Sequence, residues 1–68
     1  MTEYEQWIKV AFSYHHLPPE LQQISQPYCE LALRMHADLP PNRETSTALR
    51  KLVESRDCAI RAHLMGVA

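Results

Sequence analysis

The segment 42–47 combines residue types that can bind an anion at the start of a helix. Asn42 is a strong N-cap residue, and Arg43 and Thr45 would lie in the first turn after it. A helix N-terminus presents backbone N–H groups and the positive end of the helix dipole, which together favour a phosphate. Arg43 would add a forked contact, while Thr45 and Ser46 would donate their hydroxyls. Physics alone favours the simpler interpretation, an ordinary capped helix start.

Two further features would extend this segment into a nucleotide-binding surface. Arg50 and Lys51 follow one to two helical turns later and would add positive charge. Tyr14 and Tyr28 offer aromatic rings, and such rings can stack on a nucleobase. Both tyrosines also have a simpler interpretation, because Tyr28 fits an apolar helix stripe and Tyr14 could anchor a loop.

Histidines and cysteines are the remaining residues that could hold a metal or act as nucleophiles. The sequence contains six of them: His15, His16, His36, His63, Cys29 and Cys58. Their spacings do not match the C-x-x-C, H-x3-H or H-E-x-x-H patterns of zinc sites. No nucleophile elbow or oxyanion glycine occurs beside them. We therefore expect no metal, no cofactor and no enzymatic activity, with both thiols reduced and buried.

Length and composition restrict the chain to one small domain over residues 1–68. It is 46% hydrophobic and 22% charged, and its single glycine argues against an all-β fold, whose turns consume glycine. A net charge of −1 disfavours a nonspecific DNA or RNA binder. No apolar run is long enough to span a bilayer and no signal peptide opens the chain, so we expect an intracellular protein.

Prolines and apolar spacing predict an all-α fold: a short N-terminal helix followed by an antiparallel helical hairpin. The first helix is expected over 3–12. Pro19 suits the first turn of a second helix, which Pro27 either kinks or divides in two. Pro40 and the proline after it end that helix. A third helix over 42–64 would be about 33 Å long.

Capping and apolar stripes predict how these helices start and pack. Thr2 and Glu5 have the spacing of a capping box for the first helix. The stripes expected to face the core are Tyr4, Trp7, Ile8 and Ala11 in the first helix, Tyr28, Leu31, Ala32, Met35 and Leu39 in the second, and Thr45, Ala48, Leu49, Leu52, Val53, Ala59, Ile60 and Leu64 in the third. The third helix is longer than the rest of the chain can cover, so we expect a homo-oligomer.

The order of these motifs resembles a known family. Residues 8–15 read I-K-V-A-F-S-Y-H, residues 29–35 read C-E-L-A-L-R-M, and residues 39–52 read L-P-P-N-R-E-T-S-T-A-L-R-K-L. Over about residues 8–64 the pattern is similar to the helical-hairpin domain of phage anti-CBASS and Thoeris anti-defence proteins. The turn-helix signature is its most specific part.

The resemblance implies a sponge that sequesters cyclic nucleotide immune signals in the cytoplasm of the infected bacterial host, without cleaving them. Family members assemble as oligomers, often hexamers, and hold cyclic di- or trinucleotides or cyclic ADP-ribose isomers between protomers. The matching positions are Phe12, Tyr14, His15, Asn42, Arg43, Glu44, Ser46, Ala48, Leu49, Lys51 and Leu52. The chain departs from the pattern at Arg50, Val53 and Cys58, where many relatives have threonine, glutamate and tryptophan.

Two functions of different classes follow from the sequence. The first is sequestration of a cyclic nucleotide, with ligand-binding residues Tyr14, Tyr28, Asn42, Arg43, Thr45, Ser46, Arg50 and Lys51. The alternative is a small helical interaction module that inhibits a host protein by direct docking. A hydrolase of the signal would need a metal or a base that the sequence motifs do not offer.

Overall fold

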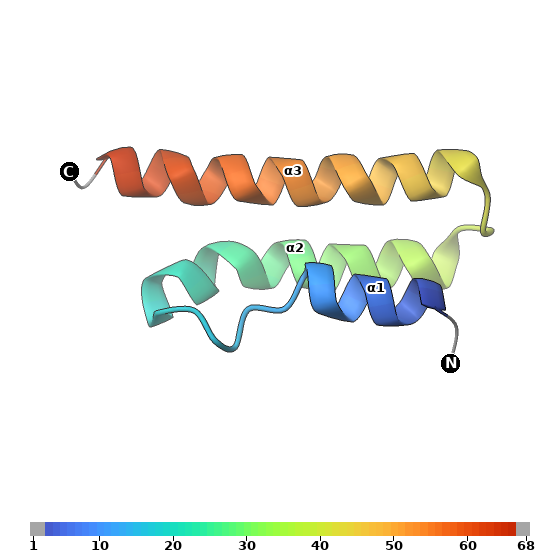
Figure 1. Cartoon of the computed structure of the whole chain (residues 1–68), viewed down its shortest axis with the longest axis horizontal. Coiled ribbons are helices and arrows are strands. Elements are labelled where there is room, and N and C mark those ends of the chain that lie inside the picture. The colour runs from blue at the N-terminus through green and yellow to red at the C-terminus, as the bar shows by residue number, and fades with distance from the viewer. Residues whose placement is uncertain (1–2, 67–68) are drawn as a thin grey trace.

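The computed structural model describes residues 3–66, and all regular structure in that range is helical, as expected. Helix α1 spans Glu3–Ala11, α2 spans Pro19–Asp38 and α3 spans Arg43–Gly66. Figure 1 shows α2 and α3 running antiparallel along a molecule 40 Å long, joined at one end by the turn 39–42. Helix α1 lies beside the half of this hairpin that is nearer the turn.

Helix α1 starts where the spacing predicts and is one residue shorter. Its last turn closes with the backbone N–H of Phe12 donating to the carbonyl of Ile8 at 2.9 Å. The expected capping box cannot be followed, because Thr2 lies outside the described residues.

Helix α2 is bounded by prolines on both sides. Pro19 occupies its first turn, and the N–H groups of Leu21 and Gln22 both donate to the carbonyl of Pro18 at 2.9 Å. The helix continues through Pro27, so the chain contains one long second helix and not two. It ends before Leu39, which is extended because it precedes a proline (φ −103°, ψ 145°).

The hydrophobic core is small and lies where α1 meets the hairpin. Its fully buried hydrophobic residues are Ile8, Phe12, Ala32 and Leu49. The stripe prediction is wrong for Leu31, Leu39 and Leu64, which are 45%, 43% and 46% exposed. Each apolar stripe is wider than the contact between the packed helices, so the residues at the edges of a stripe remain exposed.

The two cysteines are free and differ in environment. Cys29 is half-buried and packs against the core, and this burial raises the pKa of its thiol. Cys58 is exposed, so the expectation that both thiols are buried is wrong for this residue. It lies nine residues after Leu49, which is about 180° around the helix from the core.

Within the described residues, none of the helices has the length and hydropathy that a membrane span requires.

Candidate functional site

Asn42 caps the start of α3, as the sequence predicts. Its side-chain oxygen Oδ1 accepts a hydrogen bond from the backbone N–H of Thr45 at 3.0 Å, and its carbonyl accepts one from the N–H of Ser46 at 3.1 Å. The first two N–H groups of the helix, at Arg43 and Glu44, have no intrahelical acceptor, as in any α-helix. This end of α3 therefore has the donors and the dipole polarity that an anion requires.

Thr45 holds the turn together. It is 5% exposed, and its hydroxyl donates to the carbonyl of Pro40 at 2.8 Å and lies 3.3 Å from Asn42 Oδ1. The sequence predicts that this hydroxyl donates to a ligand, but in the structure it is used within the turn. Thr45 therefore acts on the candidate site by positioning Asn42 and the first turn of α3.

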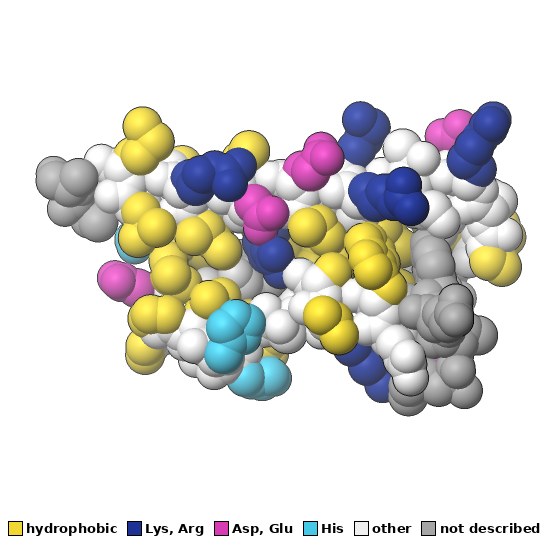
Figure 2. Space-filling view, in the orientation of Figure 1, with side chains coloured by type: hydrophobic (Ala, Val, Ile, Leu, Met, Phe, Trp, Pro, Cys, Tyr) yellow, Lys and Arg dark blue, Asp and Glu magenta, His cyan; other side chains and the backbone are white. Residues whose placement is uncertain are grey.

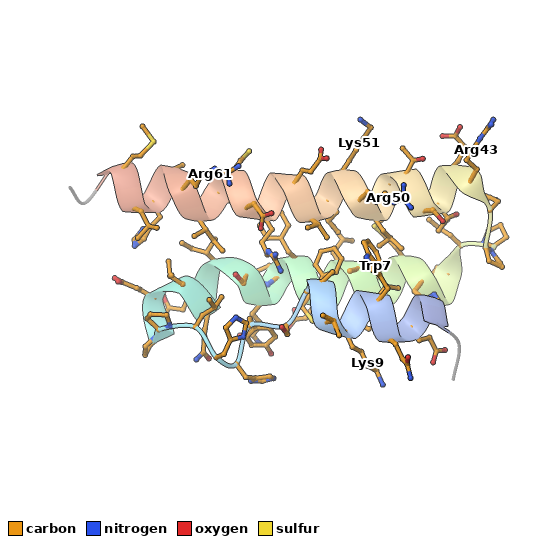
Figure 3. All side chains as sticks on the ribbon, in the orientation of Figure 1. Trp7, Lys9, Arg43, Arg50, Lys51 and Arg61 are labelled. Atoms are coloured by element: carbon orange, nitrogen blue, oxygen red, sulfur yellow. The ribbon has the colours of Figure 1, made fainter. Side chains whose placement is uncertain are left out.

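Cationic side chains follow the cap along the surface of α3. Arg43, Ser46 and Arg50 are spaced at i, i+3 and i+7, so they share one side of the helix. Figure 3 shows Arg43 and Lys51 pointing away from α2. Both arginines and Lys51 are exposed, and Ser46 is half-buried. Figure 2 shows that carboxylates lie between the Lys and Arg side chains along α3, so the positive charge is local.

Neither tyrosine of the expected site lies near Arg43 within one chain. Tyr28 accepts a hydrogen bond from the Ser55 hydroxyl at 3.4 Å, and Ser55 is about 18 Å along the α3 axis from Arg43. Tyr14 lies in the loop after α1, with its ring 4.3 Å from that of His15 between centroids, and this loop leads away from the turn 39–42 (Figure 1). A ligand that contacts Arg43 together with Tyr14 or Tyr28 must therefore lie between two chains.

Arg56 is a structural residue whose role is not predicted from the sequence. Its guanidinium donates to the carbonyl of Ala11, lies 5.7 Å from the centre of the Phe12 ring and pairs with Asp57 at 2.9 Å. Only 13% of its side chain is exposed. It fastens α3 to the C-terminal end of α1, and the signal for this role is an arginine that interrupts an apolar stripe.

Trp7 is the chain's single tryptophan and remains 38% exposed, although the stripe pattern predicts that it packs inward. Its ring meets Phe12 edge-on, with centroids 6.4 Å apart. Figure 3 shows it projecting from α1 on the side of the molecule where Arg50 lies. Trp7 therefore provides an intrinsic fluorescence reporter on that side.

The histidines are dispersed. His36 Nε2 lies 3.3 Å from Glu5 Oε1, His63 Nε2 lies 3.6 Å from Glu20 Oε2, and the other two histidines are exposed. Across residues 3–66, no three His, Cys, Asp or Glu side chains gather as a metal site.

The start of α3 thus combines a side-chain cap, exposed cations and N–H groups without an intrahelical acceptor, which is the chemistry that an anion requires. It belongs to the segment 39–52, on which the expectation of an anti-defence family rests. Among family models, curated proteins and solved structures, none matches this chain.

Proposed function

We propose that the protein sequesters a cyclic oligonucleotide signal as a homo-oligomer in the cytoplasm of an infected bacterial host. One observation at the start of α3 carries this proposal. Asn42 caps the N-terminus of the helix, and Arg43, Ser46 and Arg50 lie on one side of it. The resemblance of segment 39–52 to the anti-defence family supports the choice of ligand, because that family binds cyclic nucleotides.

The chemistry of a phosphodiester suits these residues. Its oxygens accept hydrogen bonds from backbone N–H groups, and Arg43 offers a planar fork that can bind two of them. Arg50 and Lys51 add positive charge, while Thr45 positions the cap. The stacking tyrosine comes from a second chain, because neither Tyr14 nor Tyr28 lies near Arg43 in its own chain.

The mechanism is stoichiometric. Binding lowers the free concentration of the signal below the threshold of its effector, and no bond is made or broken. Each molecule of signal removed therefore requires one occupied site, and inhibition scales with the amount of protein.

A thermal-shift panel tests the proposal. A cyclic dinucleotide, a cyclic trinucleotide and a cyclic ADP-ribose isomer are each mixed with the protein, and a bound ligand raises the melting temperature by mass action. Heat denaturation of the complex then returns intact nucleotide from a sponge and altered nucleotide from an enzyme. If no nucleotide is retained, the proposal fails and docking on a host protein becomes the better hypothesis.

Arg43→Ala locates the binding site. Loss of one charge-assisted hydrogen bond should weaken the binding free energy by about 1.5–3 kcal/mol, which is roughly a ten- to hundredfold loss of affinity. Arg61→Ala is the matched control, because Arg61 is also exposed on α3 but lies 18 residues further along. The titrations can be followed by Trp7 fluorescence. Unchanged affinity in Arg43→Ala, with unchanged assembly, would place the pocket elsewhere.

Tyr14→Ala and Tyr14→Phe separate stacking from loop anchoring. A base stacked on the ring contributes about 1–3 kcal/mol, so the alanine variant loses affinity and the phenylalanine variant keeps it. Circular dichroism monitors the loop-anchoring role, since a loosened loop lowers the melting temperature without ligand. Equal affinity of both variants and wild type would remove Tyr14 from the site.

A further inference from the structure

Hydrogen bonds hold the loop 12–18, which connects α1 to α2. The backbone N–H of Leu17 donates to the carbonyl of Tyr14 at 3.0 Å and closes a turn. His15 and His16 occupy the two central positions of this turn, and both are exposed. Figure 2 shows histidine side chains gathered on the surface in this part of the molecule. The turn therefore presents two imidazole rings to solvent.

The rings of Tyr14 and His15 form a close, tilted pair on this turn. Their centroids are 4.3 Å apart, and the ring planes are inclined by 31°. Tyr14 is half-buried, whereas His15 is exposed. A nucleobase can add to the exposed side of such a pair, because every base has a π-face that stacks on tyrosine or histidine rings. The ring pair is therefore the part of the loop that is suited to receive a base.

Gln22 of α2 ties the backbone of this turn to a helix. Its side-chain amide Nε2 donates to the carbonyl of Leu17 at 2.7 Å and to that of His15 at 3.4 Å. Its own backbone N–H donates to the carbonyl of Pro18 at 2.9 Å, which holds Gln22 in the first turn of α2. One side chain thus fixes the carbonyls on both sides of the exposed end of the turn.

An ordered loop binds a ligand more tightly than a mobile loop, because binding does not have to supply the free energy that orders it. We propose that Gln22 is a positioning residue for ligand binding, which holds the turn so that the Tyr14–His15 ring pair receives a base of the nucleotide. This inference rests on the proposed function, in which a tyrosine of a second chain stacks on the ligand. It adds the ring of His15 to that contact and a residue that acts through the loop.

Gln22→Met tests the positioning role, with Gln23→Met as the matched control. Methionine keeps an unbranched side chain and a similar helix propensity but cannot donate a hydrogen bond to the loop. Gln23 is exposed at the next position of the same helix. The probe is whichever cyclic dinucleotide, cyclic trinucleotide or cyclic ADP-ribose isomer raises the wild-type melting temperature most. We expect roughly three- to tenfold weaker binding for Gln22→Met and unchanged binding for Gln23→Met.

A double-mutant cycle separates positioning from a general loss of stability. If Gln22 acts through the ring pair, Gln22→Met should weaken binding in the wild-type background but not in Tyr14→Ala, which lacks the pair. A residue that only stabilises the fold would weaken binding equally in both backgrounds. Circular dichroism at the titration temperature checks that each variant is folded.

His15→Ala provides a second test that does not depend on the folding of the Gln22 variant. His15 is exposed, so its substitution removes one ring of the pair without disturbing the core. We expect binding to weaken about fivefold or more. Unchanged affinity in this variant overturns the ring pair as the place where a base stacks.

The outcomes distinguish this inference from the proposed function. A wild type that binds a nucleotide, together with unchanged affinity in Gln22→Met or equal losses in the two backgrounds, overturns the positioning role and leaves sequestration intact. A wild type that binds none of the nucleotides overturns both.

Discussion

The hairpin of α2 and α3 has two broad sides that differ in how they are covered. On the side where α1 packs, Ile8 and Phe12 are fully buried and Arg56 bonds to the end of α1. Away from α1, Leu31 of α2 is nearly half exposed. The comparison shows that the core depends on α1, because apolar side chains are fully buried where this third helix packs on the hairpin and stay partly exposed where no helix of the chain covers them.

Removing the main contact of α1 should have the largest effect on stability. Phe12→Ala deletes a fully buried ring, which costs about 3–5 kcal/mol, as much as the whole core of so small a domain supplies. We therefore expect loss of the cooperative thermal transition in circular dichroism. Leu33→Ala, at an exposed leucine, is the control, and a transition within a few degrees of wild type for Phe12→Ala would contradict this account of the covered side.

Arg56→Met should weaken the covered side less severely. Methionine keeps an unbranched apolar stem but removes the donor to the Ala11 carbonyl and the cation beside Phe12, a loss of about 1.5–3 kcal/mol. Urea denaturation measures the change in the free energy of unfolding. Arg61→Met, at an exposed arginine of the same helix, should change it little, and equal effects of the two substitutions would show that Arg56 does not fasten α1.

Asn42→Ala should lower the stability less, because it removes a single hydrogen bond from the turn that joins α2 to α3. Loss of the bond from Oδ1 to the Thr45 N–H costs about 1 kcal/mol, or roughly a 4–8 °C lower melting temperature in a domain of this size. Asn42→Asp keeps an acceptor at the same place and should retain most of the stability. An aspartate variant as unstable as the alanine variant would argue against the cap.

The two thiols should differ in reaction rate without a large effect on stability. Thiolate is the reactive form, and burial raises the pKa of Cys29, with the charge of Glu30 adding to the effect and that of Arg56 opposing it. At neutral pH we expect exposed Cys58 to react first with a disulfide reagent, and Cys58→Ser to abolish the fast phase. Reductant should not change the melting temperature, because both cysteines are free. Equal rates for the two thiols would contradict their assigned environments.

The pKa of Cys29 also predicts the direction of a pH effect. Its folded pKa is raised above the ordinary value of 9.0, so the native state holds the thiol proton more tightly than the unfolded chain does. This contribution to stability is complete below that value and is lost as the pH rises through the folded pKa. Cys29→Ala should flatten the alkaline decline in the free energy of unfolding, measured in urea between neutral and alkaline pH.

Local features of the sequence were sufficient to predict the hairpin turn. Two prolines end α2 and Asn42 starts α3, and each acts through its own backbone geometry or a bond three residues away. The expected site could be predicted only in part, because the commitment of the Thr45 hydroxyl to Pro40 depends on how the turn closes.

The exposure of individual stripe residues could not be predicted in the same way. Leu31 and Ala32 are neighbours in one apolar stripe, yet one is 45% exposed and the other is fully buried. Helical spacing shows that one side of a helix is apolar. The spacing does not show what covers that side, because the pattern is the same for a helix of the same chain and for another molecule. The distance from Arg43 to Tyr14 and Tyr28 likewise depends on how the helices are aligned along one another. Residue spacing within one helix gives no information on that alignment.

The shortness of α1 has a consequence for local unfolding. At nine residues it is below the length at which an isolated helix persists in water, so it is ordered only while it stays packed on the hairpin. It should open independently of α2 and α3, and its amide hydrogens should exchange with solvent faster than those at the centre of either longer helix. Each opening exposes Leu49 and Ala32, which are otherwise fully buried, so the packing of α1 also keeps the apolar centre of the hairpin out of contact with other proteins.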